Sequence, residues 1–443
     1  MFPLVQIMTD PTLLGLLSIG LIFLLMGLGV PVFAALGLAG IAGIVFVQDV
    51  SYVYNVLQNF AFNKTAAYLL TVIPLFIIMG NFALHAGVGK SLFHVAKRWC
   101  GHLPGGLAIS TIFTCAGFSA TSGSSVATAA TVGSISLPEM KQAGYDKRLS
   151  AGCVAAGGVL GVLIPPSVLL VFYAALTEVS AGKMLVAGVI PGVLSVAVFV
   201  AGVFIISLIK PEMCPKGERV GWKKRFTSLR RAWQLLLLII VVLGSIYTGW
   251  ATPTEAASLG AMASVLFLLM SKQDRKTKLK AIGTSSRDAV NTTVMIMMTM
   301  LGAGIYSFFL SLVRIPQFVS AWVIDLPLPA IVIIALILLL YIPMGMFLDA
   351  FSMLVITLPI LFPVVTSLGF DPIWFGILAI KMCEIGLITP PIGLNVYVIA
   401  GLDKDTTLTD VFTGASWFIL MEVVTVVIIF SFPLIATYLP NTM

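Results

Sequence analysis

Charged residues are scarce in this chain. They make up 10% of its 443 residues, against about 25% in an ordinary soluble domain, while apolar residues make up 59%. The mean hydropathy is +1.09. This composition excludes an ordinary soluble protein, and the long apolar stretches that recur along the chain are typical of membrane-spanning helices. The net charge of +7 reflects basic connecting loops and does not indicate a nucleic-acid partner.

Metal-ligating and redox-active residues are equally few. There are three histidines, His85, His94 and His102, and none is spaced with cysteines or carboxylates as in a metal site. The five cysteines show no CxxC spacing and mostly fall in apolar segments, so we expect small core residues. They are Cys100, Cys115, Cys153, Cys214 and Cys383.

Several functional signatures are also missing. No GxxxxGK[ST] loop occurs, which argues against a primary pump, and no paired nucleophile and base indicates an enzyme. The first eleven residues contain no Lys or Arg, so we do not expect a signal peptide. We therefore predict neither an enzyme nor an organic cofactor.

Prolines reveal an internal duplication. Four prolines of the first half return 225 residues later, and Trp99 returns as Trp322. The proline pairs are Pro104 with Pro329, Pro138 with Pro363, Pro165 with Pro390, and Pro166 with Pro391. We therefore predict two structural repeats, residues 1–223 and 224–443.

Apolar segments define the topology of each repeat. We expect an all-α polytopic membrane protein with spans at 12–29, 32–48, 67–85, 149–178, 184–209, 232–249, 254–271, 291–312, 371–401 and 414–438. Two more apolar regions, 105–138 and 329–366, are too long for one crossing, and each has a small or charged tip, so we predict re-entrant helical hairpins. Five spans and one hairpin per repeat make the second repeat inverted relative to the first.

Positive charges orient these segments. The loops 86–104, 139–148, 210–231, 272–290 and 402–413 carry 21 of the 25 Lys and Arg residues. Because cytoplasmic loops are enriched in these residues, we place the five loops inside and both termini outside. The segments 89–103 and 314–325 are amphipathic, and we expect them to lie in the membrane interface.

The first hairpin tip and the helix that follows it carry unusual sequences. Of residues 116–136, 17 of 21 are Gly, Ala, Ser or Thr. Tight helix packing accounts for many of them, but the run 121–125 should also break the helix and expose hydroxyls, carbonyls and amides suited to Na⁺ or a carboxylate. The Pro165–Pro166 pair should break the span 149–178, either as a structural kink or as part of an ion site.

The second repeat offers a corresponding pair. Asp349 aligns with Ser124 at the hairpin tip, where it serves as a helix N-cap, a functional carboxylate, or both. Pro390 and Pro391 should break the span 371–401. Lys381 and Glu384, three residues apart, are most simply read as an internal ion pair, with contact to substrate or ion as the alternative.

The motifs together resemble a known family. They are Ser-Ala-Thr-Ser-Gly-Ser-Ser at 119–125, Ile-Pro-Pro-Ser at 164–167, Gly-Met-Phe-Leu-Asp at 345–349 and Gly-Leu-Ile-Thr-Pro-Pro-Ile-Gly-Leu-Asn at 386–395. They are similar to those of the large membrane subunit of TRAP (tripartite ATP-independent periplasmic) transporters, over essentially the whole chain. The resemblance implies Na⁺-driven symport of an organic acid, delivered by a periplasmic binding protein, by an elevator mechanism in a bacterial inner membrane. It also implies a small four-helix membrane subunit, which we expect to be a separate chain.

The sialic-acid branch of the family looks most similar, with C4-dicarboxylate uptake as the alternative. A stand-alone Na⁺/dicarboxylate symporter and a channel are the rival functions, although a channel fits inverted repeats with broken helices poorly. Dependence on a binding protein separates the TRAP assignment from the stand-alone symporter.

The predicted site lies between the tips and the breaks. The substrate ligands are predicted to be Ser122, Ser124, Ser125, Ser167 and Asn395. Two or more Na⁺ sites are predicted, and their ligands are Ser122, Gly123, Ser124, Gly161 and Ile164 in the first repeat and Gly345, Asp349, Ser352, Gly386 and Thr389 in the second. Residues 105–178 and 329–401 are predicted to move as one transport body against a scaffold formed by the remainder.

Overall fold

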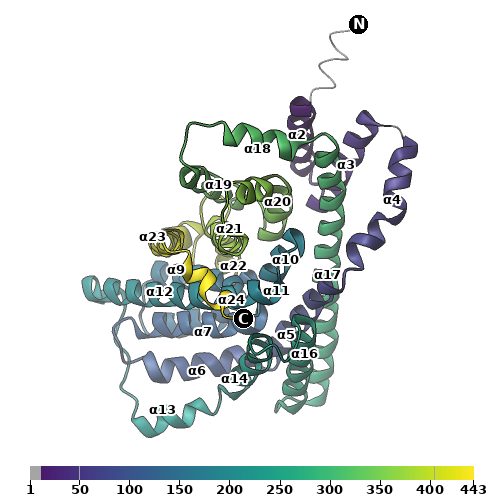
Figure 1. Cartoon of the computed structure of the whole chain (residues 1–443). Coiled ribbons are helices and arrows are strands. Elements are labelled where there is room, and N and C mark those ends of the chain that lie inside the picture. The colour runs from purple at the N-terminus through teal and green to yellow at the C-terminus, as the bar shows by residue number, and fades with distance from the viewer. Residues whose placement is uncertain (1–10, 49, 404) are drawn as a thin grey trace.

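The computed structural model of the chain describes residues 11–443 except residues 49 and 404, and the regular elements among these residues are all helices (Figure 1). Six of the described helical segments are long and apolar enough to cross a membrane, and two bent helix pairs raise that number to eight. The predicted all-α, multi-span fold class is therefore confirmed. The inverted relation of the two repeats stays a prediction.

The first half of the chain contains the elements expected of repeat one. They are α2 (Pro11–Gly27), α3 (Val32–Val47), α4 (Val50–Thr65), a 3₁₀ turn (Tyr68–Thr71) leading into α5 (Val72–His85), α6 (Val88–Cys100), α7 (Gly106–Ser122), α8 (Ser125–Gln142), α9 (Lys147–Leu163), α10 (Val168–Thr177), α11 (Ala181–Ala187) and α12 (Val189–Ile209). Helices α7 and α8 form the predicted hairpin. Helices α9 and α10 form the predicted broken span, bent by 45°.

The second half contains the remaining elements. Its elements are a 3₁₀ turn (Pro211–Met213), α13 (Trp222–Leu229), α14 (Trp233–Ile239), a π-helical turn (Ile240–Gly244), α15 (Ser245–Tyr247), α16 (Pro253–Met270), α17 (Arg275–Leu312), α18 (Ile315–Ile324), α19 (Ala330–Gly345), α20 (Ala350–Ser367), α21 (Pro372–Gly386), α22 (Leu394–Leu402), α23 (Leu408–Ser431) and α24 (Leu434–Asn441). Helices α19 and α20 form the second hairpin, and α21 and α22 are the two parts of the second broken span.

Three helical regions differ from the prediction. Helices α4 and α13 lie where loops were expected, and α17 begins at Arg275, not at residue 291. Polar residues interrupt the apolar ones in α4, and α13 and the start of α17 are rich in Lys and Arg, so hydropathy does not reveal these helices. The start of α17 is instead fixed by Asp274, whose carboxylate accepts a hydrogen bond from the Thr277 N–H at 3.1 Å as an N-cap.

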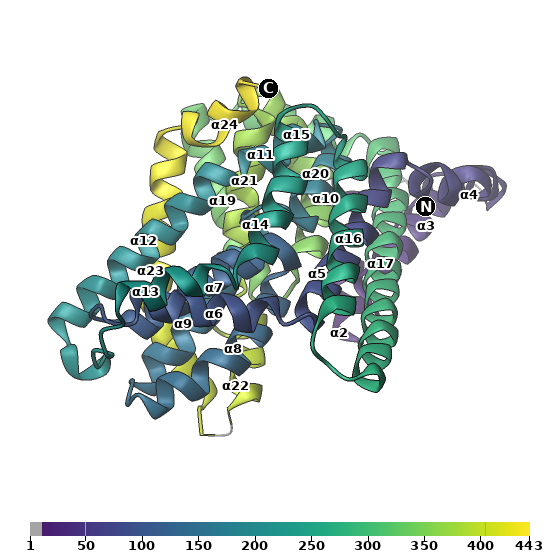
Figure 2. The same ribbon diagram turned by 90° about the horizontal axis from the view of Figure 1, so that it is seen from below.

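The helices gather in two groups on opposite sides of the molecule (Figures 1 and 2). Helices α2 to α5 lie with α16 and α17 on one side, and helices α6 to α9 lie with α12 and α23 on the other. The hairpin α19–α20 and helices α10, α11, α21 and α24 lie between them in the view of Figure 1.

Glycines allow close helix crossings within each group. A Cβ atom on Gly302 of α17 would lie 2.1 Å from the Phe33 carbonyl oxygen of α3. A Cβ atom on Gly152 of α9 would lie 2.2 Å from the backbone of Gly414 of α23. Small residues at such crossings are the usual means of close helix packing in membranes. They fix α3 to α17 and α9 to α23.

The five basic loops lie together at one end of the structure. Two ion pairs join these loops, Lys97 with Glu139 and Lys147 with Asp410. Three hydrogen bonds join these loops or the helix ends beside them. They run from Trp99 Nε1 to the Arg225 carbonyl, from the Asp146 N–H to the Met213 carbonyl, and from Gln273 Nε2 to the His85 carbonyl. The predicted grouping of these loops is therefore confirmed for their described residues, with Lys404 outside them. The compartment that this end faces stays a prediction, and residues 1–10, with the N-terminus, are likewise not described.

Candidate ion and substrate site

The first hairpin turns at Gly123 and Ser124. Gly123 ends α7 in the left-handed conformation, with φ 59° and ψ 16°, which favours glycine. Ser124 is extended, and its hydroxyl accepts a hydrogen bond from the Ala127 N–H at 3.4 Å, so it is the N-cap of α8. The predicted break in the run 121–125 is therefore present. It exposes backbone amides at the start of α8, because the first turn of a helix has no internal acceptors for them.

The first broken span stops in front of its proline pair. Pro165 and Pro166 are joined by a cis peptide bond, and α10 begins after Ser167. In a continuous helix the N–H groups of residues 165 and 166 would bond the carbonyls of Gly161 and Val162. Because proline has no N–H, those two carbonyls lose their helical donors.

This tip and this break are in direct contact. A Cβ atom on Gly161 would lie 2.7 Å from the Ser124 carbonyl oxygen. A Cβ atom on Gly123 would lie 3.3 Å from the Pro166 carbonyl oxygen. The structure therefore brings together the residues predicted for the first ion site, with Ile164 at the end of α9 beside them.

The second repeat places its tip and break together in the same way. A Cβ atom on Gly345 would lie 2.8 Å from Gly386 Cα. Asp349 is the N-cap of α20, and its carboxylate accepts hydrogen bonds from the Ser352 N–H at 3.1 Å and the Ser352 hydroxyl at 2.5 Å. Thr389 lies in the break and donates its hydroxyl to a carbonyl of α21 at 2.6 Å.

Both clusters suit a hard cation. They offer carbonyls, hydroxyls and, in the second cluster, one carboxylate, which are the oxygen ligands that such cations prefer. The Gly386 carbonyl already accepts the Thr389 N–H at 3.1 Å, but a carbonyl has a second lone pair for a ligand. The residues predicted to bind Na⁺ therefore fit that ion chemically.

A cavity of about 120 Å³ opens beside the first tip. Ser122, Gly123 and Ser124 line it from the hairpin, Asn81 from α5 and Thr292 from α17. Further lining residues are Ile77, Gly80, Leu84, Phe118, Ala127, Val168, Ile296 and Phe351. The cavity thus lies between hairpin one and the helix group that contains α5 and α17.

Asn81 and Thr292 are site residues that the sequence analysis missed. Each is a polar residue within or at the edge of a predicted span, and this is the signal that could have identified them. Both residues line the same cavity as Ser122 and Ser124 of the tip, so the candidate site draws on both groups of helices.

Three of the predicted substrate ligands do not line this cavity. Ser125, Ser167 and Asn395 are 5%, 0% and 0% exposed. The Ser167 hydroxyl caps α10 by accepting the Leu170 N–H at 3.4 Å. Asn395 of α22 donates to the Ala155 carbonyl of α9 at 3.4 Å and so connects the broken spans of the two repeats.

A larger cavity, of about 420 Å³, lies between η1 (the 3₁₀ turn Tyr68–Thr71), α10, α17 and α20. Among its lining residues, two carry polar side chains, Glu178 and Ser307. The hairpin tips do not line it. Because a substrate site needs several convergent polar groups, the smaller cavity is the better candidate.

The predicted pairing of Lys381 with Glu384 is wrong. Lys381 forms an ion pair with Glu422 of α23 and donates a hydrogen bond to the Ser195 hydroxyl of α12 at 3.0 Å. Lys381 and Glu422 are 1% and 0% exposed. The helix spacing suggested the nearer partner, but tertiary packing supplies another one from a different helix.

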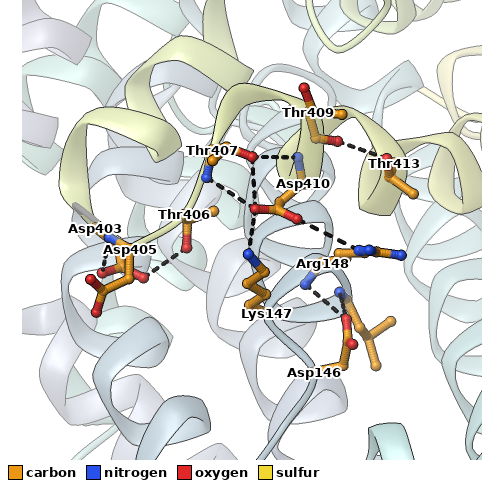
Figure 3. A network of polar contacts seen from close by, with 11 residues as sticks. Asp146, Lys147, Arg148, Asp403, Asp405, Thr406, Thr407, Thr409, Asp410 and Thr413 are labelled. Carbon is orange, nitrogen blue, oxygen red and sulfur yellow. Dashed lines mark hydrogen bonds and ion pairs between the residues drawn. The ribbon is translucent and has the colours of Figure 1, made fainter.

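A second polar network joins the basic loops of the two repeats (Figure 3). Asp410, at the start of α23, pairs with Lys147 at 2.7 Å and Arg148 at 3.5 Å, both at the start of α9. Lys141 of α8 pairs with Asp405. Close by, the hydrogen bond from the Thr406 hydroxyl lowers the pKa of Asp403 below its usual value. These contacts hold α8, α9 and α23 together at their loop ends.

Comparison with known proteins gives a consistent family. Residues 19–435 match the family described as "Tripartite ATP-independent periplasmic transporter, DctM component". The chain is 35% identical over 447 residues to the C4-dicarboxylate TRAP transporter large permease protein DctM of Vibrio cholerae, covering 96% of each chain. It is 32% identical over 334 residues to the sialic acid TRAP transporter large permease protein SiaM of the same organism, covering 75% of this chain and 77% of the relative.

Two further comparisons concern length and fold. The isethionate TRAP transporter permease protein DctMQ of Oleidesulfovibrio alaskensis is 33% identical over 401 residues, which cover 88% of this chain and 60% of that relative. The structure of the Alcanivorax borkumensis YdaH transporter aligns with a TM-score of 0.62 at 13% identity, covering 96% of this chain and 98% of that one. At that identity the likeness shows a shared fold.

Proposed function

The chain belongs to the DctM component family of tripartite ATP-independent periplasmic transporters, and from this membership we propose that it imports a small organic acid by Na⁺ symport. The observation that carries the proposal is the cavity at the first hairpin tip. Ser122 and Ser124 line it together with Asn81 and Thr292, at the start of helix α8. Hydroxyls, amides and a helix N-terminus together favour a carboxylate.

The size of this cavity bears on the substrate. At about 120 Å³ it is smaller than the pockets of about 300–1,000 Å³ that hold drug-sized ligands. We therefore favour a C4-dicarboxylate, the substrate in the name of a 35% identical relative. Sialic acid, towards which the sequence motifs leaned, is the alternative, and a 32% identical relative is named for it.

Sodium coupling is proposed for the two tip–break clusters. The first would use Ser122, Gly123, Ser124, Gly161 and Ile164, and the second would use Gly345, Asp349, Ser352, Gly386 and Thr389. A bound Na⁺ supplies positive charge at each cluster. In each cluster the ligand oxygens come from two chain segments, the hairpin tip and the broken helix. An ion that binds oxygens of both segments would therefore hold the hairpin to its broken helix.

The packing supports a larger moving body than residues 105–178 and 329–401. Helix α23 crosses α9 at Gly152 and Gly414, and Glu422 of α23 pairs with Lys381 of α21 in the protein interior. Ser195 of α12 accepts a hydrogen bond from the same lysine. Separating these contacts would leave buried charges unpaired, which is strongly unfavourable. We propose that α12 and α23 move with the hairpins against the group of α2 to α5, α16 and α17.

The proposed partners are a periplasmic substrate-binding protein and a small four-helix membrane subunit on a separate chain. Longer relatives support the small subunit, because the match covers only 60% of the relative named DctMQ. The proposed location is a bacterial inner membrane, with both termini in the periplasm. A stand-alone Na⁺/dicarboxylate symporter would need neither partner, and this requirement separates the two functions.

Uptake by the reconstituted protein tests this proposal. Liposomes containing the chain and its small subunit would be assayed with radiolabelled succinate and with sialic acid, each with its binding protein. We expect saturable uptake that requires both an inward Na⁺ gradient and the binding protein. Uptake that persists after K⁺ replaces Na⁺ would refute the coupling. Uptake of free substrate at an equal rate would favour the stand-alone symporter.

A further inference from the structure

Glu384 of α21 carries a carboxylate that the two ion clusters do not use. The residue is 1% exposed, and neither carboxylate oxygen forms a hydrogen bond of normal geometry with any residue that the structure describes. Lys381, one helical turn earlier, is engaged by Glu422 and Ser195. A carboxylate in such surroundings is costly, because it has lost its water and forms no ion pair with a described residue.

Two other polar residues lie in this region on different helices, and the backbone N–H of one of them, Asn395, donates to the carbonyl of Leu387, three residues after Glu384, at 3.3 Å. The Ser125 side chain, at the start of α8, faces the Glu384 carboxylate. The Asn395 side-chain oxygen is also buried without a donor. Gly158 of α9 keeps this region open, because a Cβ atom there would lie 2.8 Å from the Ser125 carbonyl oxygen and 3.2 Å from Asn395 Nδ2.

The charge balance of the region is negative. Glu384 and Glu422 face one lysine, Lys381, and that lysine pairs with Glu422. From the other surrounding helices, Ser125 of α8, Ser195 of α12 and Asn395 of α22 contribute neutral groups. One negative charge therefore lacks a counter-charge among the described residues of this cluster.

We infer that Glu384, Ser125 and Asn395 form a third binding site for Na⁺, separate from the two tip–break clusters. The site offers a carboxylate, a hydroxyl and an amide oxygen, all of them hard ligands. The ion would neutralise the buried charge. The inference rests on the proposed Na⁺ coupling and deepens it.

The location of this site gives it a distinct role. Ser125 belongs to the first hairpin, whereas Glu384 and Asn395 flank the break of the second repeat. Each tip–break cluster joins segments of one repeat only. An ion bound at the third site would therefore hold the first hairpin to the broken helix of the second repeat, so that these two parts of the moving body move together.

Equilibrium binding of ²²Na⁺ tests the inference without an uptake assay. The chain with its small subunit would be purified in lipid nanodiscs, and bound Na⁺ per chain would be counted at saturation. Glu384→Gln keeps the side-chain shape and removes the charge. We expect it to bind one Na⁺ fewer than wild type. The matched control is Glu139→Gln, the same substitution at an exposed carboxylate. This variant should bind the same number of Na⁺ ions per chain as wild type.

The outcomes separate this inference from the proposed function. A wild-type protein that binds no Na⁺ refutes the coupling itself. A Glu384→Gln protein that binds the wild-type number refutes the third site alone, as expected if a proton or water satisfies the carboxylate. If Glu384→Gln does not fold, Ser125→Ala replaces it and should weaken the affinity of one Na⁺ by roughly 10–100-fold. Unchanged affinity in that variant overturns the inference.

Discussion

Ser124 and Asp349 occupy equivalent positions 225 residues apart, and each caps the second helix of its hairpin. The cap uses one lone pair of the side-chain oxygen, so other lone pairs stay available to a ligand. Capping and ion binding are therefore compatible at both residues. Substitutions that keep one role and remove the other can separate them.

Asp349 allows such a separation. Asp349→Ser retains a good capping side chain but loses the charge, whereas Asp349→Ala loses both. We expect both variants to need more Na⁺ for half-maximal uptake. Only Asp349→Ala should also lose about 1 kcal/mol of stability, measured as a lower thermal midpoint. A wild-type Na⁺ activation curve for Asp349→Ser would reduce this residue to a cap.

Ser124 can be tested against a serine of the same hairpin. Ser134 is exposed, and its hydroxyl donates only to the Thr131 carbonyl of its own helix. We expect Ser124→Ala to raise the Na⁺ concentration for half-maximal uptake and Ser134→Ala to leave it unchanged. Equal curves for the two variants would contradict a ligand role for Ser124.

Residue-scale prediction from sequence succeeded where the signal was local. The helix break in the run 121–125 and the cap at Asp349 follow from residue type, and the structure has both. The partner of Lys381 could not be found in this way. Helix spacing indicates only neighbours on the same helix, whereas Glu422 comes from a helix that tertiary packing places alongside.

Helices show the same division at the next scale. The breaks in α9–α10 and α21–α22 were predictable because a proline pair removes two donors wherever it stands. Helix α4 and the first turns of α17 were missed because polar or charged residues interrupt their apolar ones. The crossings of α9 with α23 and of α3 with α17 depend on glycines. The sequence shows that these residues are small but does not show which helix packs against them.

The α9–α23 crossing gives a prediction at this scale. Gly152→Val would place side-chain atoms inside the Gly414 backbone, since even a Cβ atom there lies 2.2 Å away. We expect a sharply lower thermal midpoint and little folded protein in detergent. Gly283→Ala is the control, because no atom lies within 4 Å of its Cβ position, and it should be neutral or stabilising by about 0.5–1 kcal/mol. Equal folding of both variants would show that α9 and α23 are not tightly packed.

At the scale of the whole molecule, one of the places where the two helix groups meet is the first hairpin tip. A Cβ atom on Gly80 of α5 would lie 2.8 Å from the Thr121 carbonyl oxygen of hairpin one. The polar residues of the proposed site lie on both sides of this contact. The sequence indicated the hairpins as the moving elements, but it did not indicate that α12 and α23 pack with them, since that depends on buried contacts between distant segments.

Crosslinks test this assignment of the moving body. In a background without native cysteines, Asn81→Cys with Ala127→Cys joins α5 to hairpin one across the cavity. Lys147→Cys with Asp410→Cys joins α9 to α23. In the native protein, Lys147 and Asp410 form an ion pair at 2.7 Å. A short bis-maleimide should stop uptake in the first pair and leave ²²Na⁺ binding measurable. In the second pair it should leave uptake near the level of the uncrosslinked double variant, because both cysteines move together.

If the second crosslink, verified by mass spectrometry, also stops uptake, α23 belongs to the static scaffold. If the first leaves uptake intact, hairpin one does not move against α5.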